Sequence, residues 1–184
     1  MDAGEIMTYS LENFCQDGRR LLAAADNHES RDQMRQNLEK LLVDEDFGSE
    51  YLLVDDAPGP VQIHEDTEYG FCVLVYNMAE PRKSPPHDHG NSWAIYGQAR
   101  GHTDMQVWES EEKNDQEAEL KVVKEFRLEP GMAGLFDVGE IHSIDYVENA
   151  KFVRVTGTDM TKEPRKVFDP DSGAIKKVEH VGTG

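Results

Sequence analysis

The stretch Pro85–Gly97, PPHDHGNSWAIYG, places two histidines one residue apart, after a proline pair and before an apolar run. Successive side chains of a β-strand point to opposite faces, so His87 and His89 are predicted to project to the same side. The proline pair stiffens the approach to these residues. Two imidazoles side by side on one face can chelate a divalent metal ion. A complete site then requires a third ligand from elsewhere in the chain.

The size and charge of the chain limit the number of domains and the kinds of partner that it can have. A length of 184 residues favours one domain that buries a real core. Lysine and arginine total 19 against 37 aspartate and glutamate, so the formal net charge is −18. Contacts with phosphates need clustered basic charge, so this balance argues against nucleic acid or an anionic membrane surface as a partner. The acidity is typical of a well-solvated surface.

Targeting signals are not apparent in the sequence. It has no run of about 18 apolar residues, so no membrane span is predicted. The N-terminal stretch MDAGEIMTYSLENFC lacks the basic and apolar regions of a secretory signal. Cys15 and Cys72 are too few for a disulfide framework. We therefore expect a cytoplasmic protein with both cysteines buried as small apolar residues.

The N-terminal part has a helical pattern. Apolar residues recur at helical spacing in two blocks between residues 10 and 44. The intervening NHESRDQ reads as a break, with Ser30 and Gln33 at capping-box spacing for the second helix. These helices carry no motif of their own, so we expect them to pack on the outside of another unit.

The pattern changes at Tyr51. Short runs rich in valine, isoleucine and aromatic residues alternate with proline and glycine turns, which predicts an antiparallel sandwich or barrel. The acidic stretch 109–118 is predicted to be an exposed hairpin loop. The expected organisation is a helical segment over residues 1–50, a barrel over 51–160 and a polar tail over 161–184 that wraps the surface or frays.

A third histidine supplies the missing ligand. His142 lies in PGMAGLFDVGEIHSIDY, where Gly139 turns the chain before a new strand. It is far from His89 in the sequence, so only the fold brings the two together. An antiparallel barrel does so readily, because inward residues of neighbouring strands converge on a shared interior.

The spacing of these residues resembles the two motifs of the cupin family. The motif G-x5-H-x-H-x4-E-x6-G aligns with His87, His89 and Gly101, and G-x5-P-x-G-x2-H-x3-N aligns with Gly131, Gly139 and His142. The motif glycine, glutamate, proline and asparagine are replaced by Pro81, Ala94, Asp137 and Tyr146. The resemblance covers roughly residues 60–160. It implies a mainly β, single-domain cupin fold, the double-stranded β-helix or jelly roll, with the three histidines as metal ligands.

The departure at Ala94 narrows the resemblance, because alanine cannot coordinate a metal. Three neutral histidines leave about three open positions on a six-coordinate ion. The thiol dioxygenases, a cupin branch that includes cysteine and mercaptopropionate dioxygenases, use such a site, and residues 70–103 resemble theirs in the spacing of strand, turn and H-D-H. Two differences set this chain apart. The late strand KFVRVTGTD offers Arg154 in place of their Ser-x-His-x-Tyr run, and PVQIHED holds His64 where cysteine dioxygenase has its carboxylate-binding arginine.

Six further residues are candidates for the pocket. Arg154 is a candidate for holding an anionic substrate, although its valine neighbours equally allow it to lie on the surface. His64 is a candidate for replacing the missing arginine. His102 follows a glycine turn and is a candidate proton donor, or a solvated strand-end residue. Aromatic residues that line a pocket or belong to the core complete the set: Trp93, Tyr96 and Tyr146.

These observations lead to one leading hypothesis and two alternatives. The leading one is a cysteine dioxygenase-like, non-haem iron oxidoreductase whose partners are dioxygen and a small thiol- or carboxylate-bearing metabolite. The first alternative is a cupin isomerase, lyase or hydrolase using Zn, Ni or Mn, since imidazole suits several metals. The second is a non-catalytic, metal-dependent binding protein. Monomer and homodimer remain open.

Overall fold

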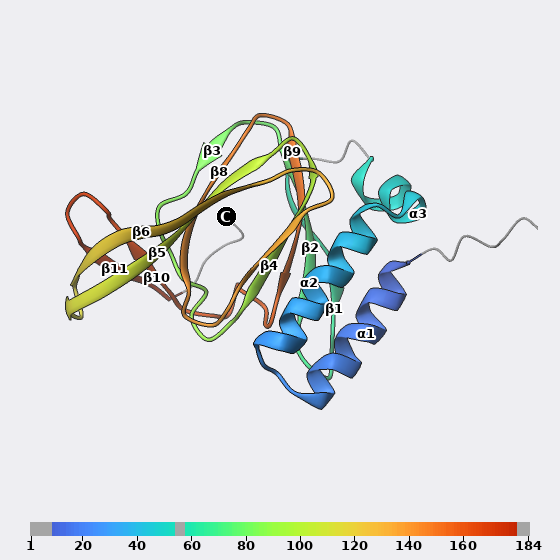
Figure 1. The fold of residues 1–184 in the computed structure, drawn as a ribbon, viewed down its shortest axis with the longest axis horizontal. Helices are drawn as coiled ribbons and strands as arrows, with labels where there is room; N and C mark the ends of the chain where they lie inside the picture. Colours follow the sequence, from blue (N-terminus) through green and yellow to red (C-terminus); the bar gives the residue numbers. More distant parts are fainter. Residues whose placement is uncertain (1–8, 54–57, 180–184) are drawn as a thin grey trace, which may run out of the picture.

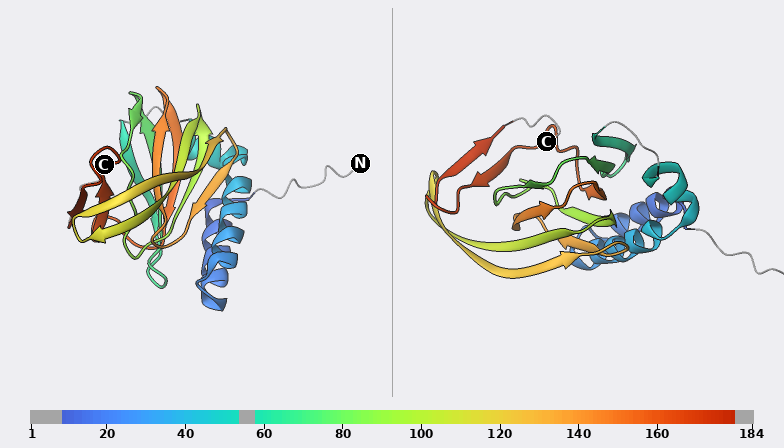
Figure 2. Two further views of the ribbon diagram at one scale, coloured as in Figure 1. Left: turned by 60° about the vertical axis from the view of Figure 1, so that its left-hand side comes forward. Right: turned by 90° about the horizontal axis from the view of Figure 1, so that it is seen from above.

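The computed structural model describes residues 9–53 and 58–179, so the outermost parts of the predicted helical segment and tail lie outside it (Figure 1). Two antiparallel sheets face each other, and helices cover the outer face of one of them (Figures 1 and 2). The predicted fold class, mainly β with the N-terminal helices packed outside, is confirmed.

Four helical elements precede the sheets. They are α1 (Leu11–Ala24), α2 (His28–Leu42), α3 (Glu45–Phe47) and a π-helical turn (Gly48–Leu52). Ser10 forms a capping box with Asn13 at the start of α1. The capping box predicted for α2 is wrong, because the helix begins earlier. Asn27 is its N-cap, and its side chain accepts a hydrogen bond from the Ser30 backbone N–H (3.0 Å).

The sheets have the strand order of a jelly roll. The larger sheet contains, in spatial order, β1 (Gly59–Glu65), β2 (Cys72–Met78), β9 (Ala150–Thr156), β4 (Ala94–Arg100) and β7 (Ala133–Phe136). The smaller contains β3 (Arg82–Lys83), β8 (Ile141–Tyr146), β5 (Thr103–Asn114) and β6 (Glu117–Leu128). The orders β2-β9-β4-β7 and β3-β8-β5-β6 are those of two Greek keys folded into an eight-stranded jelly roll, the architecture of cupins.

Both faces of the larger sheet are buried. One face packs on the helices through a core that includes Leu38, Ile95 and Val153, and the other faces the barrel interior, where Ala94 and Tyr96 lie. Gly97 allows α2 to approach β4 closely, because a Cβ at this position would lie 2.7 Å from a leucine methyl group of α2. The two cysteines are free and buried, as predicted, one in each core.

The C-terminal part differs from the prediction of a polar tail. It forms a two-stranded hairpin of β10 (Arg165–Phe168) and β11 (Ile175–Val178), with Phe168 fully buried. The hairpin lies beside the far end of β5 and β6 (Figure 2). The predicted loop over residues 109–118 is exposed, but most of it continues these two strands.

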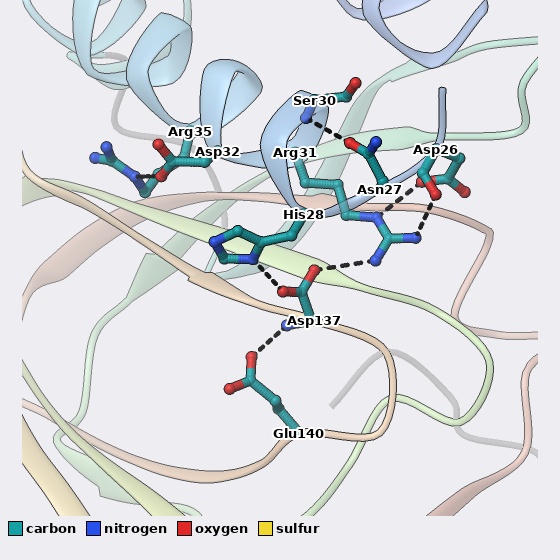
Figure 3. Close-up of polar contacts among 9 residues, drawn as sticks. All are labelled: Asp26, Asn27, His28, Ser30, Arg31, Asp32, Arg35, Asp137 and Glu140. Carbon is teal, nitrogen blue, oxygen red and sulfur yellow. Dashed lines mark hydrogen bonds and ion pairs between the residues drawn. The ribbon is translucent and has the colours of Figure 1, made fainter. Parts of the chain in front are cut away.

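A polar cluster ties the helices to the loop between β7 and β8 (Figure 3). The Asp137 carboxylate contacts the His28 imidazole and accepts a hydrogen bond from Arg31 (3.0 Å), both on α2. Burial alone would raise the pKa of Asp137, but the hydrogen bonds from His28 and Arg31 outweigh it and lower the pKa. The residue that replaces the motif proline therefore docks α2 on the barrel.

Candidate metal centre

The three predicted ligands come from two segments that pair directly. His87 and His89 lie between β3 and β4, outside the regular strands, whereas His142 is the second residue of β8. The His87 backbone N–H donates to the His142 carbonyl (2.9 Å), and the His142 N–H donates back to the His87 carbonyl (3.0 Å). This bridge places the two imidazoles side by side, with ring centroids 4.6 Å apart.

The three imidazoles form a buried cluster that fits a metal ion. One ring nitrogen from each lies within 4.8 Å of the others. His87 is 6% exposed, His89 4% and His142 0%. The His87 Nδ1–H donates to the Pro85 carbonyl (2.9 Å), which leaves Nε2 free as a ligand atom. Nδ1 of His89 and both ring nitrogens of His142 are buried without a hydrogen-bond partner. Buried nitrogens in this state are suited to a metal.

The electrostatics keep these imidazoles neutral. Burial lowers the pKa of His87 to about 4. The hydrogen bond to the Pro85 carbonyl acts to raise this pKa, and the positive charges of nearby arginines act to lower it. Burial also holds the pKa values of His89 and His142 well below the usual range, and repulsion among the histidines adds to the effect. At neutral pH all three therefore present lone pairs rather than protons, as metal ligation requires.

Aromatic residues surround the cluster, and no carboxylate belongs to it within the described part of the chain. The Phe136 ring stacks on His142 with centroids 3.9 Å apart. The Tyr96 hydroxyl lies 3.2 Å from His89 Nε2. Ala94, at the motif glutamate position, is completely buried inside the barrel. The site is therefore neutral and built from three histidines.

A small cavity with a volume of about 180 Å³ opens beside the cluster, and His87 is the member of the cluster that lines it. Arg154 lines it, 8% exposed, with its guanidinium 4.9 Å from the centroid of the Tyr76 ring. The sequence allowed Arg154 to point either inward or to the surface. In the structure Val153 and Val155 face the helices, and Arg154 faces the barrel interior. Tyr96 and Tyr146, two of the predicted site residues, also line the cavity.

Three candidates lie elsewhere. His64 follows a register shift in β1 and faces the helix side, with its ring against Phe71. Trp93 belongs to the core between the larger sheet and the helices. His102 sits in the turn between β4 and β5 and does not line the cavity. The structure therefore does not bring these three residues to the metal cluster: His64 and Trp93 lie on the helix side of the larger sheet, and His102 lies in a turn.

Sequence reasoning missed Arg165, which lines the cavity from β10. It lies in the predicted tail and belongs to no motif. The only local signal was the alternation in RKVF, where Arg165 and Val167 share a strand face and both reach the cavity.

The H-D-H-G segment holds β10 in place. Asp88 Oδ1 accepts hydrogen bonds from the backbone N–H groups of Lys166 (2.8 Å) and Gly90 (3.1 Å). Gly90 has a φ of +61°, and a Cβ there would lie 2.2 Å from the Pro164 carbonyl oxygen. Glycine is required because it tolerates this conformation and leaves room for the chain that leads into β10. The Asp88 side chain therefore has a structural role, because it joins the metal-ligand segment to β10.

Comparisons with known proteins add little about function. No protein-family model and no curated protein matches the chain. Similar solved structures include the Cnp3 cupin domain of Schizosaccharomyces pombe (14% identity, 54% of this chain and 60% of that chain, TM-score 0.41). Another is the DMSP lyase DddQ of Ruegeria pomeroyi DSS-3 (14% identity, 67% of this chain and 59% of that chain, TM-score 0.44). A third is the hydroquinone 1,2-dioxygenase PnpCD (13% identity, 55% of this chain and 66% of that chain, TM-score 0.42). This chain spans less than two thirds of the length of each of these three proteins. Because the TM-scores are below 0.5, no function of these proteins is assigned to this chain.

Within the described residues, no helix is both long and apolar enough to cross a membrane.

Proposed function

We propose that this chain is a cupin-type metalloenzyme, a non-haem iron dioxygenase that acts on a small anionic metabolite. One observation carries the proposal. Within the described residues, three buried, neutral histidines form a cluster without a carboxylate partner, and one of them, His87, lines a small cavity that Arg154 also lines. A redox metal beside an anion-binding cavity is the combination that a dioxygenase of a carboxylate-bearing substrate needs.

The three histidines would hold the metal in this proposal. Neutral imidazole suits iron, and the His87 tautomer is set by its bond to Pro85. Ferrous iron bound there would supply the dioxygen chemistry that side chains alone lack. Ala94 adds no ligand, so the protein itself leaves positions open for substrate.

Other residues orient the substrate and control protons. The Arg154 guanidinium is suited to a bidentate pair with a carboxylate. Burial raises the pKa of the Tyr96 hydroxyl, although Arg154 opposes this, so the phenol stays protonated and can donate a hydrogen bond next to His89. Phe152 and Val167 add apolar surface to the cavity, where the hydrocarbon part of a substrate would pack.

A cupin lyase or isomerase that uses Zn, Ni or Mn as a Lewis acid is the second candidate. Tyr76, Tyr96 and Tyr146 favour it, because the three phenols that line the cavity can move protons to and from a substrate. A metal-dependent binding protein without turnover is the third.

The test begins with elemental analysis of the purified protein. Samples reloaded separately with Fe(II), Zn(II), Ni(II) or Mn(II) are then assayed for oxygen consumption with a panel of thiol carboxylates. We expect consumption with iron alone, and its loss together with metal in His142→Ala. His102→Ala, which alters a histidine outside the cavity, is the matched control and should match the wild type. Product formation with zinc or nickel and no oxygen uptake with iron would assign a lyase or isomerase instead.

A further inference from the structure

The cavity concentrates positive charge in an acidic protein. Among residues 9–53 and 58–179, three arginines line it, Arg82, Arg154 and Arg165, and no aspartate or glutamate does. The whole chain carries a formal net charge of −18. Because carboxylates abound elsewhere, their exclusion from this wall is a specific feature of the site.

Two of these arginines are withdrawn from solvent, since Arg154 is buried and Arg165 is half-buried. Arg154 comes from β9 and Arg165 from β10, and the Nε of each is buried without a hydrogen-bond partner. Neither forms an ion pair with a carboxylate among the described residues. Arg154 lies against the Tyr76 ring and hydrogen-bonds to Tyr96, contacts that leave its charge unneutralised.

The two arginines line the same cavity, and their positive charges influence each other. Burial lowers the pKa of Arg165, and the positive charge of Arg154 acts in the same direction, whereas Tyr96, Tyr76 and Asp88 act against them. Two like charges in a partly buried site disfavour each other unless a negative charge lies between or beside them. A bound anion with two charged groups would relieve both this repulsion and the unmet hydrogen bonds.

We infer that the substrate of this cavity is a small dicarboxylate, with one carboxylate bound by Arg154 and the other by Arg165. The inference rests on the proposed function, which places the substrate in this cavity. The cavity volume of about 180 Å³ lies below the range of roughly 300–1,000 Å³ that holds larger ligands, so it suits a short-chain acid of about four carbons. The planar guanidinium fork matches a carboxylate in bidentate fashion.

The position of Arg165 is itself built into the fold. Asp88 binds the backbone N–H of Lys166, the next residue, and the His87 segment bridges to Val167. The Lys166 side chain points elsewhere and pairs with Glu112 (2.5 Å). The metal-ligand segment therefore positions the second guanidinium directly.

The test is isothermal titration of the purified full chain, with its metal content quantified, using succinate and butyrate. The two acids share a chain length and differ by one carboxylate. We expect succinate to bind at least about tenfold more tightly, as a charged hydrogen-bonded pair typically gives. Arg165→Gln should abolish this difference without changing metal content. Lys166→Gln, which removes the same charge from the same strand but faces away, should preserve it.

Equal affinities for the two acids in the wild type would overturn the inference, even if Arg165→Gln does not fold. Tighter binding of inorganic phosphate than of succinate would also overturn it, in favour of a single dianionic group. These outcomes are distinct from failure of the proposed function. In that case succinate would still bind selectively, but no iron-dependent oxygen consumption would follow.

Discussion

Removing the Asp88 carboxylate tests how the metal-ligand segment holds β10. A single oxygen, Oδ1, accepts both the Lys166 and the Gly90 backbone N–H groups. Asp88→Ala leaves these two donors without their partner. Asp88→Asn can keep an oxygen at the same place and removes only the charge. The two variants therefore separate the hydrogen bonds from their electrostatic reinforcement.

The magnitude follows from two bonds of known type. Hydrogen bonds to a charged group contribute about 1.5–3 kcal/mol each and neutral ones about 0.5–1.5. Asp88 is partly exposed, so water can replace part of the hydrogen bonding that is lost in Asp88→Ala. We expect the free energy of unfolding to fall by about 2–4 kcal/mol in Asp88→Ala and by about 1–2 kcal/mol in Asp88→Asn.

Urea unfolding of both variants at neutral pH measures these values. Asp145→Ala is the matched control, because this aspartate is exposed on β8 and its side chain makes no hydrogen bond among the described residues; a change below about 0.5 kcal/mol is expected there. If Asp88→Ala destabilises no more than the control, β10 is not held by this carboxylate and the reasoning is refuted.

Three other perturbations test the site and the packing around it. Alanine at any one of the three histidines should remove most of the metal, whereas Ala94→Glu, which restores the motif carboxylate, should retain metal and lose activity; elemental analysis beside turnover measures both, and full metal in the His142→Ala protein would contradict the three-histidine site. Gly97→Ala should cost about 1–3 kcal/mol by urea unfolding, because its Cβ would press on α2; an unchanged midpoint would show that the helix can move away. Asp137→Asn should lower the free energy of unfolding by an amount that depends on pH. The pKa of His28 is raised by its bond to Asp137, so this contribution is complete below the unfolded value of about 6.5 and is lost as pH rises through the folded value. The pKa of Asp137 is lowered, so its contribution is present above the unfolded value of about 3.9 and is lost as pH falls through the folded value. The variant should therefore lose more stability at about pH 6 than at about pH 9, and an equal loss at both would contradict the pairing.

The pKa values of the metal ligands determine the pH range in which protons compete with the metal. Ordinary histidines would exchange metal for protons as the pH falls through about 6. Burial lowers the pKa of His87 to about 4 and holds the pKa values of His89 and His142 well below their usual range, so competition by protons is displaced to more acidic conditions. The sequence could not show this, because the shift arises from desolvation in the folded interior.

Local patterns were enough to predict much of the fold and the centre of the site. Short strands between proline and glycine turns predicted an antiparallel barrel, and helical spacing predicted α1 and α2. Three histidines at motif spacing predicted one cluster, and the structure brings them within 4.8 Å. This worked because strand alternation, turn chemistry and motif spacing depend on residues that are close in the chain or on an order that the topology preserves.

The tertiary structure alone decided which side chains complete the site. Every residue of β9 is buried, since helices cover one face of the sheet and the barrel closes the other, so alternation could not tell whether Arg154 points inward. A register shift in β1 turns His64 away from the cavity. Arg165 lines the cavity because Asp88, which is distant in the sequence, binds the strand that carries Arg165. The histidine motif thus determined where a metal can bind. Long-range hydrogen bonds and two-sided burial, which have no local signature, determined which arginines face the cavity beside it.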